Sequence, residues 1–74
     1  MGGKLRSFTA KELEKVLAQY GFELASQKGS HRKWRQSVTG KQVIVPYHGG
    51  KALPTGTLRT ILSAAEIPDK EWRT

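Results

Sequence analysis

The first clear pattern in the chain is helical and covers residues 9–20. Apolar side chains recur there at i, i+3, i+4 and i+7, the spacing that builds one face of an α-helix. These side chains belong to Leu13, Val16, Leu17 and Tyr20. Thr9 and Glu12 have the spacing of a capping box at the helix start, and Gly21 is a typical stop. We therefore predict a helix over residues 9–20.

Three strand-like runs follow this helix. Residues 22–27 alternate with period two, 31–37 form a second run, and 42–46 are rich in β-branched side chains and end at a proline. Turn residues at 28–30 and at Thr39-Gly40 separate the runs. Such short connections favour three antiparallel strands in a meander.

A second amphipathic helix is predicted over residues 55–65, after a glycine-containing loop at 47–54. Its apolar positions repeat the same helical spacing and are Leu58, Ile61, Leu62 and Ala65. Thr55 or Thr57 is the predicted cap of this helix. Near the end of the chain, Asp69 is expected to cap a short turn.

The predicted order is α-β-β-β-α, in an α+β fold. Two amphipathic helices would cover one face of a three-stranded antiparallel sheet and leave the other face open. Seventy-four residues suffice for one domain, so we expect residues 1–74 to form a single domain. Function is to be sought on the open face.

Alternation along a strand assigns the side chains of the second run, residues 31–37, to the two faces of the sheet. Trp34 is predicted to point toward the helices, as a core residue more than as a base-stacking one. Arg32 and Gln36 share its parity and are expected to turn outward near the strand ends. The opposite parity places three side chains on the open face: His31, Lys33 and Arg35. Trp72 is expected to pin the last turn onto the body of the protein.

The charge balance narrows the class of partner. Thirteen Lys and Arg oppose six Asp and Glu, a formal charge of +7, which suits RNA, DNA, an acidic membrane or an acidic protein. No apolar run approaches the ~20 residues of a membrane helix, and no secretory signal precedes the first helix. The chain has no cysteine, which excludes disulfides and thiolate metal sites. We expect a cytoplasmic protein that binds no membrane.

An imidazole beside two cations is a plausible site for RNA chemistry. Histidine exchanges protons near neutral pH, so His31 could take the proton of a ribose 2′-hydroxyl. Lys33 and Arg35 would hold phosphate oxygens and offset developing charge. DNA lacks the hydroxyl, so this chemistry is specific to RNA. An exposed histidine with no catalytic role remains the alternative.

Several short motifs together resemble the HicA, or YcfA-like, family. They are Gly29-Ser30-His31 with the basic and aromatic residues 32–35, Val45-Pro46-Tyr47-His48, Gly50-Lys51, Leu53-Pro54, Gly56-Thr57-Leu58 and Ile61-Leu62. The resemblance runs from about residue 5 to residue 72. Two positions depart from the family pattern: Arg32 stands where many members have a second histidine, and Glu66 where a glycine often ends the second helix.

The resemblance implies the toxin of a type II toxin–antitoxin pair. Such a toxin would have a fold like a double-stranded-RNA-binding domain and would cleave mRNA without a metal or cofactor. A HicB-type antitoxin would bind it and mask its active site. His31 holds the position of the family's catalytic histidine. Around it we predict an RNA-binding set of Lys28, Ser30, Arg32, Lys33, Arg35, His48 and Lys51.

Alternatives remain for two of these residues and for the function. His48 is either an acid for the leaving 5′-oxygen or a loop residue, and Lys51 either a phosphate ligand beside a helix start or a solvated lysine. A complete nucleotide-binding P-loop is absent. A non-catalytic double-stranded-RNA-binding module is the main competing function, although Arg59 is the only cation of the second helix. A third reading is a protein-binding domain with a basic face.

Overall fold

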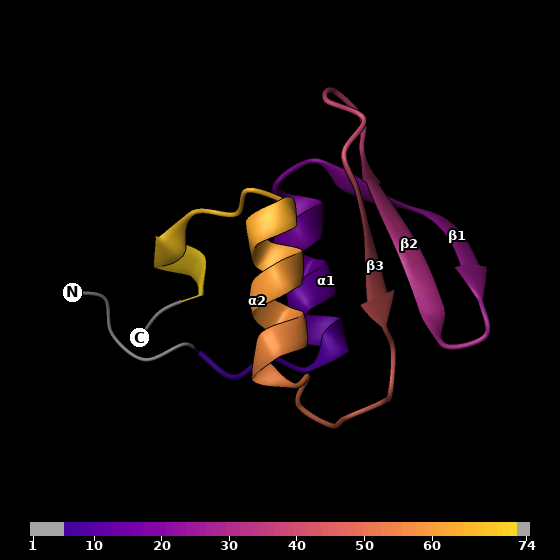
Figure 1. The fold of residues 1–74 in the computed structure, drawn as a ribbon. Coiled ribbons are helices and arrows are strands. Elements are labelled where there is room, and N and C mark those ends of the chain that lie inside the picture. The colour runs from indigo at the N-terminus through magenta and orange to yellow at the C-terminus, as the bar shows by residue number, and fades with distance from the viewer. Residues whose placement is uncertain (1–5, 73–74) are drawn as a thin grey trace.

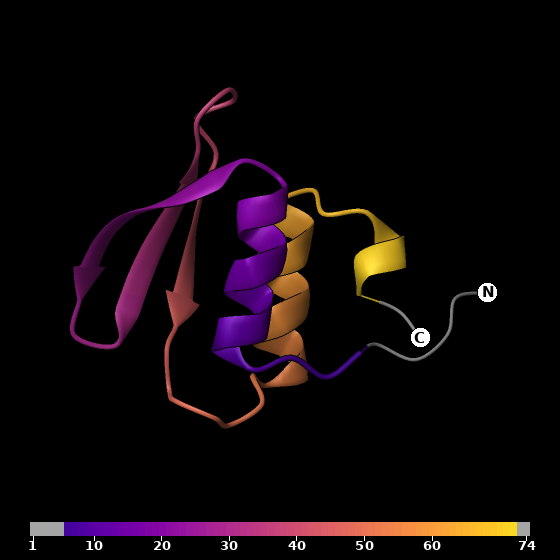
Figure 2. The same ribbon diagram turned by 180° about the vertical axis from the view of Figure 1, so that it is seen from behind.

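Two helices lie side by side on one side of a sheet. The computed structural model describes residues 6–72, in which α1 (Ala10–Gln19) and α2 (Thr55–Ala64) run in the same direction (Figure 1). Figure 2 shows from behind that both helices stay on the same side of the strands. The predicted positions of both helices are confirmed to within one residue at each end.

The sheet has the predicted meander topology. Strands β1 (Phe22–Lys28), β2 (His31–Gln36) and β3 (Gln42–Pro46) are antiparallel and lie in the order β1-β2-β3. With the two helices, this order confirms the α+β, α-β-β-β-α fold. Among residues 6–72, no helix covers the second face of the sheet (Figures 1 and 2).

The start of α1 confirms the predicted capping box. The side chain of Thr9 accepts the backbone N–H of Glu12 at 3.2 Å, and the Glu12 carboxylate accepts the backbone N–H of Thr9 at 2.8 Å. Because the ionised carboxylate accepts that N–H, the pKa of Glu12 is lowered from its ordinary value. Two amide hydrogens that a helix start leaves free are thus satisfied, which sets where α1 begins.

The ends of α2 differ from the prediction. Pro54 occupies its N-cap position and no side chain caps the helix, so the prediction of Thr55 or Thr57 as the cap is wrong. At the other end Glu66 adopts a left-handed φ of 57°. The backbone N–H groups of Glu66 and Ile67 donate to the carbonyls of Ser63 and Leu62, at 3.1 and 3.0 Å. This is a Schellman motif with glutamate at the position that favours glycine.

A bulge interrupts the predicted alternation of β1. Leu24 pairs with Trp34, but the next paired residue of β1 is Ser26, opposite Lys33, so Ala25 is an extra residue. A bulge moves the residues beyond it to the other parity. Ser26 therefore shares the open face with Lys33, whereas uninterrupted alternation would place it with Leu24.

The core lies between the helices and one face of the sheet. Its largest fully buried side chains come from every layer and are Phe8, Leu13, Leu17, Leu58, Leu62 and Val45. A final helical turn, η1 (Asp69–Glu71), follows Pro68, so Asp69 is its first residue and not its cap. Trp72 is buried as predicted and its indole N–H donates to the carbonyl of Ile67 at 2.8 Å. No helix within residues 6–72 is long and apolar enough to cross a bilayer.

Candidate functional site

A tight turn places His31 at the first position of β2. Gly29 has a φ of 60°, which glycine adopts without the steric cost that a side chain brings. Together with Ser30 it forms the two-residue connection between β1 and β2. The carbonyl of Ser30 accepts the backbone N–H of Tyr47 at 2.6 Å, which ties this turn to the end of β3. His31 is thereby held at one end of the sheet, and its side chain is exposed.

The strand register shows which face His31 occupies. Arg32 and Trp34 stand opposite Val45 and Val43, both of which are buried beneath the helices. Successive side chains alternate between faces, so His31 projects from the uncovered face. The side chains that share this face on β2 are Lys33 and Arg35, as predicted.

Lysines surround His31 on this face. Lys28 of β1 is its cross-strand partner, and Pro46 is its partner on β3. Lys33 follows two positions along the same strand. Opposed side chains on neighbouring strands have β-carbons about 5 Å apart, so the side chain of Lys28 begins directly beside that of His31. These three residues form what we call the His31 cluster: Lys28, His31 and Lys33.

Arg35 lies further along the sheet, away from the His31 cluster. Its partner on β1 is Glu23, and its Nη2 atom comes within 3.7 Å of the point where a β-carbon on Gly40 would stand. The guanidinium therefore reaches toward the turn between β2 and β3, and an acidic side chain stands across from it. Arg35 contributes positive charge to the open face but not at His31.

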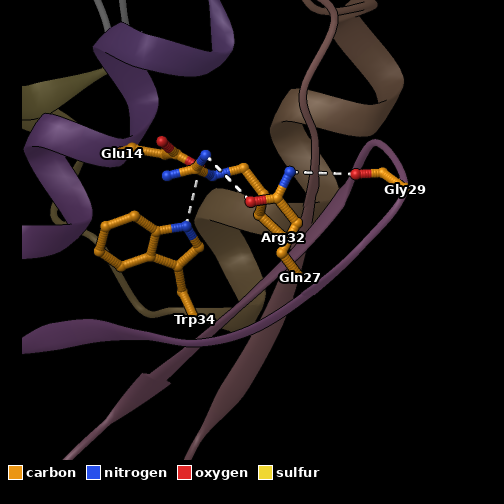
Figure 3. A network of polar contacts seen from close by, with 5 residues as sticks. All are labelled: Glu14, Gln27, Gly29, Arg32 and Trp34. Atoms are coloured by element: carbon orange, nitrogen blue, oxygen red, sulfur yellow. Dashed lines mark hydrogen bonds and ion pairs between the residues drawn. The ribbon is translucent and has the colours of Figure 1, made fainter.

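Arg32 faces α1 instead of the open side. Its Nε atom lies 2.8 Å from Oε2 of Glu14, an ion pair that lacks the angle of a directed hydrogen bond (Figure 3). Its guanidinium carbon stands 4.7 Å from the centre of the Tyr47 ring, and Nη1 donates to Gln27 at 3.4 Å. The expectation that Arg32 turns outward is wrong, because the Glu14 carboxylate and the aromatic ring hold it on the helix side.

The side chain of Gln36 also forms hydrogen bonds within the protein instead of pointing into solvent. Its Nε2 atom donates to the carbonyl of Tyr20 at 3.1 Å, and its Oε1 atom accepts the backbone N–H groups of Val38 and Thr39. These bonds satisfy the turn between β2 and β3. The expectation that Gln36 points outward is therefore wrong as well. Trp34 faces the helices as predicted, and its indole N–H donates to Oε2 of Glu14 at 2.8 Å.

His48 and Lys51 lie in the loop between β3 and α2. Both are exposed, and they line a shallow hollow of about 460 Å³ together with Ala52, Leu53 and Pro54. The loop leaves the sheet beside His31, because Pro46 at the end of β3 is the cross-strand partner of His31. The hollow opens just before the first turn of α2. The turn before His31 and the loop that carries His48 and Lys51 thus lie at the same end of the sheet (Figure 1).

Two features of the site were missed in the sequence. Glu14 is buried although it is charged, because Arg32 and Trp34 both contact its carboxylate. Ile44 stands on the open face opposite Lys33. The position of Ile44 could have been predicted, since alternation along the strand places it on the face opposite to that of Val43 and Val45. Within residues 6–72 no group of three or more histidine or acidic side chains could hold a metal ion.

Fold and surface define a small basic α+β protein whose uncovered sheet face carries a histidine among lysines. Residues 10–67 match the family model described as the HicA toxin of bacterial toxin–antitoxin. The match covers more than half of the chain, which therefore belongs to the HicA toxin family. Membership in this family implies an antitoxin partner. A comparison with curated proteins gives no significant match.

Proposed function

We propose that this toxin is an endoribonuclease that cleaves mRNA with His31 and without a metal ion. The observation that carries the proposal is the exposed imidazole of His31, with Lys28 opposite it and Lys33 two positions along the strand. An accessible base beside fixed cations is what cleavage of a phosphodiester requires of a protein that supplies no metal.

In the proposed reaction His31 acts as a general base. Its imidazole takes the proton of the 2′-hydroxyl, and the resulting O2′ attacks the adjacent phosphorus. The bond from phosphorus to the 5′-oxygen breaks, which leaves a 2′,3′-cyclic phosphate on one fragment and a 5′-hydroxyl on the other. Lys28 and Lys33 stabilise the negative charge that gathers on the phosphoryl oxygens.

The departing 5′-oxygen needs a proton, and His48 is the candidate donor. His48 lies two residues after Pro46, the last residue of β3 and the cross-strand partner of His31. Both histidines therefore belong to the same end of the sheet. Lys51 and the free amide groups at the start of α2 would hold a neighbouring phosphate of the same strand. Ser30 completes the set as a hydrogen-bonding residue in the turn before His31.

A HicB-type antitoxin is the proposed inhibitor. It would cover the open face and remove His31 from solvent. An acidic surface on the antitoxin would complement the lysines of the His31 cluster, which also bind the RNA, so inhibitor and substrate would compete for one face. The proposed place of action is the cytoplasm, where mRNA and the antitoxin are both present.

The central experiment replaces His31 by alanine. We expect His31→Ala to lower the rate of RNA cleavage by roughly a hundredfold or more and to abolish growth arrest, with circular dichroism and RNA affinity nearly unchanged. An RNA with a single 2′-deoxynucleotide at the cut should resist the parent protein, and EDTA should not slow it. Cleavage by His31→Ala at the parental rate would remove His31 from the mechanism.

His48 is tested with a substrate that needs no acid. If His48 protonates the leaving group, His48→Ala slows cleavage of ordinary RNA, and a 5′-thio leaving group restores most of the rate because a thiolate departs without a proton. A variant that is equally slow on both substrates assigns His48 to binding or folding. Strong RNA binding with no cleavage by the parent protein would instead support the non-catalytic RNA-binding module.

A further inference from the structure

We infer that Ile44 and Pro46 of β3 form a platform for an unpaired nucleobase, so that the substrate is single-stranded RNA. This inference rests on the proposed function, because it concerns the same open face. It adds a second kind of contact to that face: cations for the phosphates and an apolar strip for the base.

Ile44 is a large apolar residue that the fold leaves exposed. Its side chain is 44% exposed, whereas Val43 and Val45 beside it are 5% and 0% exposed. Alternation along β3 turns the two valines into the core and Ile44 out of it. Strand propensity explains a β-branched residue here, but it does not explain why an apolar side chain stands directly opposite Lys33 in the middle of a cationic face.

The pairing of β2 with β3 places the apolar residues of β3 directly opposite His31 and Lys33. Pro46 is the partner of His31, and Ile44 is the partner of Lys33, so β3 presents an apolar strip parallel to the His31–Lys33 strip of β2. On the other side of β2 the corresponding residues are Lys28 and Ser26, both polar. Side chains opposite each other on neighbouring strands have β-carbons about 5 Å apart, so the cations of β2 and the apolar residues of β3 are immediate neighbours. A phosphate held at β2 therefore has an apolar surface for its base on β3 and a polar one on β1.

The platform requires that the base be unpaired. In a duplex the flat faces of the bases are stacked on each other, and only an unpaired base can lay its face on a protein surface. Aliphatic side chains offer no hydrogen bond to the edge of a base, so the platform would accept any base at this subsite. Weak sequence preference at that nucleotide follows from the same chemistry.

Binding to uncleavable RNA tests the platform without relying on catalysis. The probes are an unstructured ten-nucleotide 2′-O-methyl strand and its duplex with the complementary strand, which lack the 2′-hydroxyl. We expect Ile44→Ser to weaken binding of the single strand about fivefold, less than the loss of an aromatic stacking residue would cause, and to leave duplex binding unchanged. Val38→Ser is the matched control, because Val38 is 86% exposed in the turn at the far end of the sheet.

NMR of the parent protein gives a second readout that needs no variant. The δ1 methyl group of Ile44 should shift upfield when the single strand is added, because it would lie over the ring of a base. The methyl groups of Ile61 and Ile67 are buried and serve as internal references that should not move. The duplex should leave all three methyl signals in place.

The outcomes separate this inference from the proposed nuclease activity. A parent protein that does not cleave RNA but shows the Ile44 shift and the fivefold loss keeps the platform and loses the nuclease. A parent that cleaves RNA, with no Ile44 shift and no effect of Ile44→Ser, overturns the platform alone. If Ile44→Ser weakens only antitoxin binding, Ile44 is a protein contact and the inference is wrong.

Discussion

Glu14 of α1 and Arg32 of β2 meet at the interface of helix and sheet, with 2.8 Å between Oε2 and Nε. The same carboxylate oxygen accepts the indole N–H of Trp34 (Figure 3). One buried acid therefore joins two alternate side chains of β2 to the helix. Arg32 directly follows His31 in the chain. The contact with Glu14 therefore holds β2 from the helix side of the sheet, while the imidazole of His31 projects from the uncovered face.

Glu14→Ala is expected to destabilise the fold by about 1–3 kcal/mol. The alanine would leave the Arg32 charge and the Trp34 N–H without their partner, and both groups are only partly hydrated. This loss of unfolding free energy is smaller than the loss expected for a fully buried ion pair, because the Arg32 side chain is 24% exposed. Urea denaturation followed by tryptophan fluorescence measures it.

Two further variants test the origin of that loss. Glu14→Gln keeps an acceptor for Trp34 and removes the charge, so its stability should fall between those of the parent and Glu14→Ala. Glu23→Ala removes a carboxylate from the exposed face of β1 and should change stability by no more than about 0.5 kcal/mol. Equal stabilities of Glu14→Ala and the parent would show that the contact does not hold β2 to α1.

The fold was predictable because local signals agreed with one another. The capping box at Thr9 and the glycine after Tyr20 mark the limits of α1, and the buried valines of β3 fix which face of the sheet meets the helices. The position of His31 on the open face followed from the parity of Trp34 alone. In each case the signal lay within a few residues of the element that it predicted.

Two of the errors concern contacts between elements that are distant in the chain. The side chain of Arg32 turns toward the helices because Glu14, on another element, supplies a carboxylate there. Parity in β1 changes at Ala25 because a bulge depends on the pairing with β2. Pro54 caps α2 without a side-chain hydrogen bond, and threonines next to it offered a false signal. The side-chain direction of Arg32 and the bulge at Ala25 have no local pattern that sequence alone could reveal, whereas the cap of α2 is a local choice between Pro54 and its neighbours.

RNA binding should depend steeply on salt if phosphates contact the open face. Each phosphate contact on a single strand contributes about −0.7 to the slope of log K against log salt concentration, because a counterion is released. Lys28→Gln and Lys33→Gln should each make the slope shallower by roughly that amount. Fluorescence anisotropy with the uncleavable strand, at salt concentrations from about 50 to 200 mM, measures the slope.

Lys41→Gln is the matched control for the salt series. Lys41 stands just before β3 and pairs with Glu66 at 2.9 Å, at the end of the sheet opposite His31. Its removal changes the net charge as much as the other two substitutions do. An unchanged slope in all three variants would mean that the lysines of the His31 cluster do not contact phosphate.

A hydrogen bond from Tyr20 to Glu71 links the end of α1 to η1, and the stability that it contributes is lost at alkaline pH. Its hydroxyl donates to Oε2 of Glu71 at 2.7 Å, and this bond to a carboxylate raises the pKa of Tyr20 above its ordinary value of 10.0. A raised folded-state pKa adds stability that is complete below the unfolded pKa and is lost as pH rises through the folded pKa. Tyr20→Phe should therefore be less stable than the parent at pH 7 to about 9, and the gap should narrow above about pH 10. Urea unfolding of both proteins across this range tests the sign, and a gap that widens with pH would contradict it.

Glu66 offers a stabilising substitution, because its backbone adopts a conformation that glycine prefers. Its φ of 57° closes the Schellman motif at the end of α2. A residue with a β-carbon pays a steric cost of roughly 1–2 kcal/mol in this region. The carboxylate also pairs with Lys41, and its side chain is 70% exposed, so the ion pair contributes little. Comparing Glu66→Gly with the parent alone would mix these two effects.

Glu66→Ala separates the backbone effect from the ion pair, since both variants lack the carboxylate. We expect Glu66→Gly to be more stable than Glu66→Ala by about 1 kcal/mol, which is the steric relief less the larger chain entropy of glycine in the unfolded state. Thermal and urea denaturation measure this difference. If alanine proved equal to glycine or better, the left-handed conformation of residue 66 would not be a source of strain, and the end of α2 would owe its geometry to the burial of Ile67 against the core.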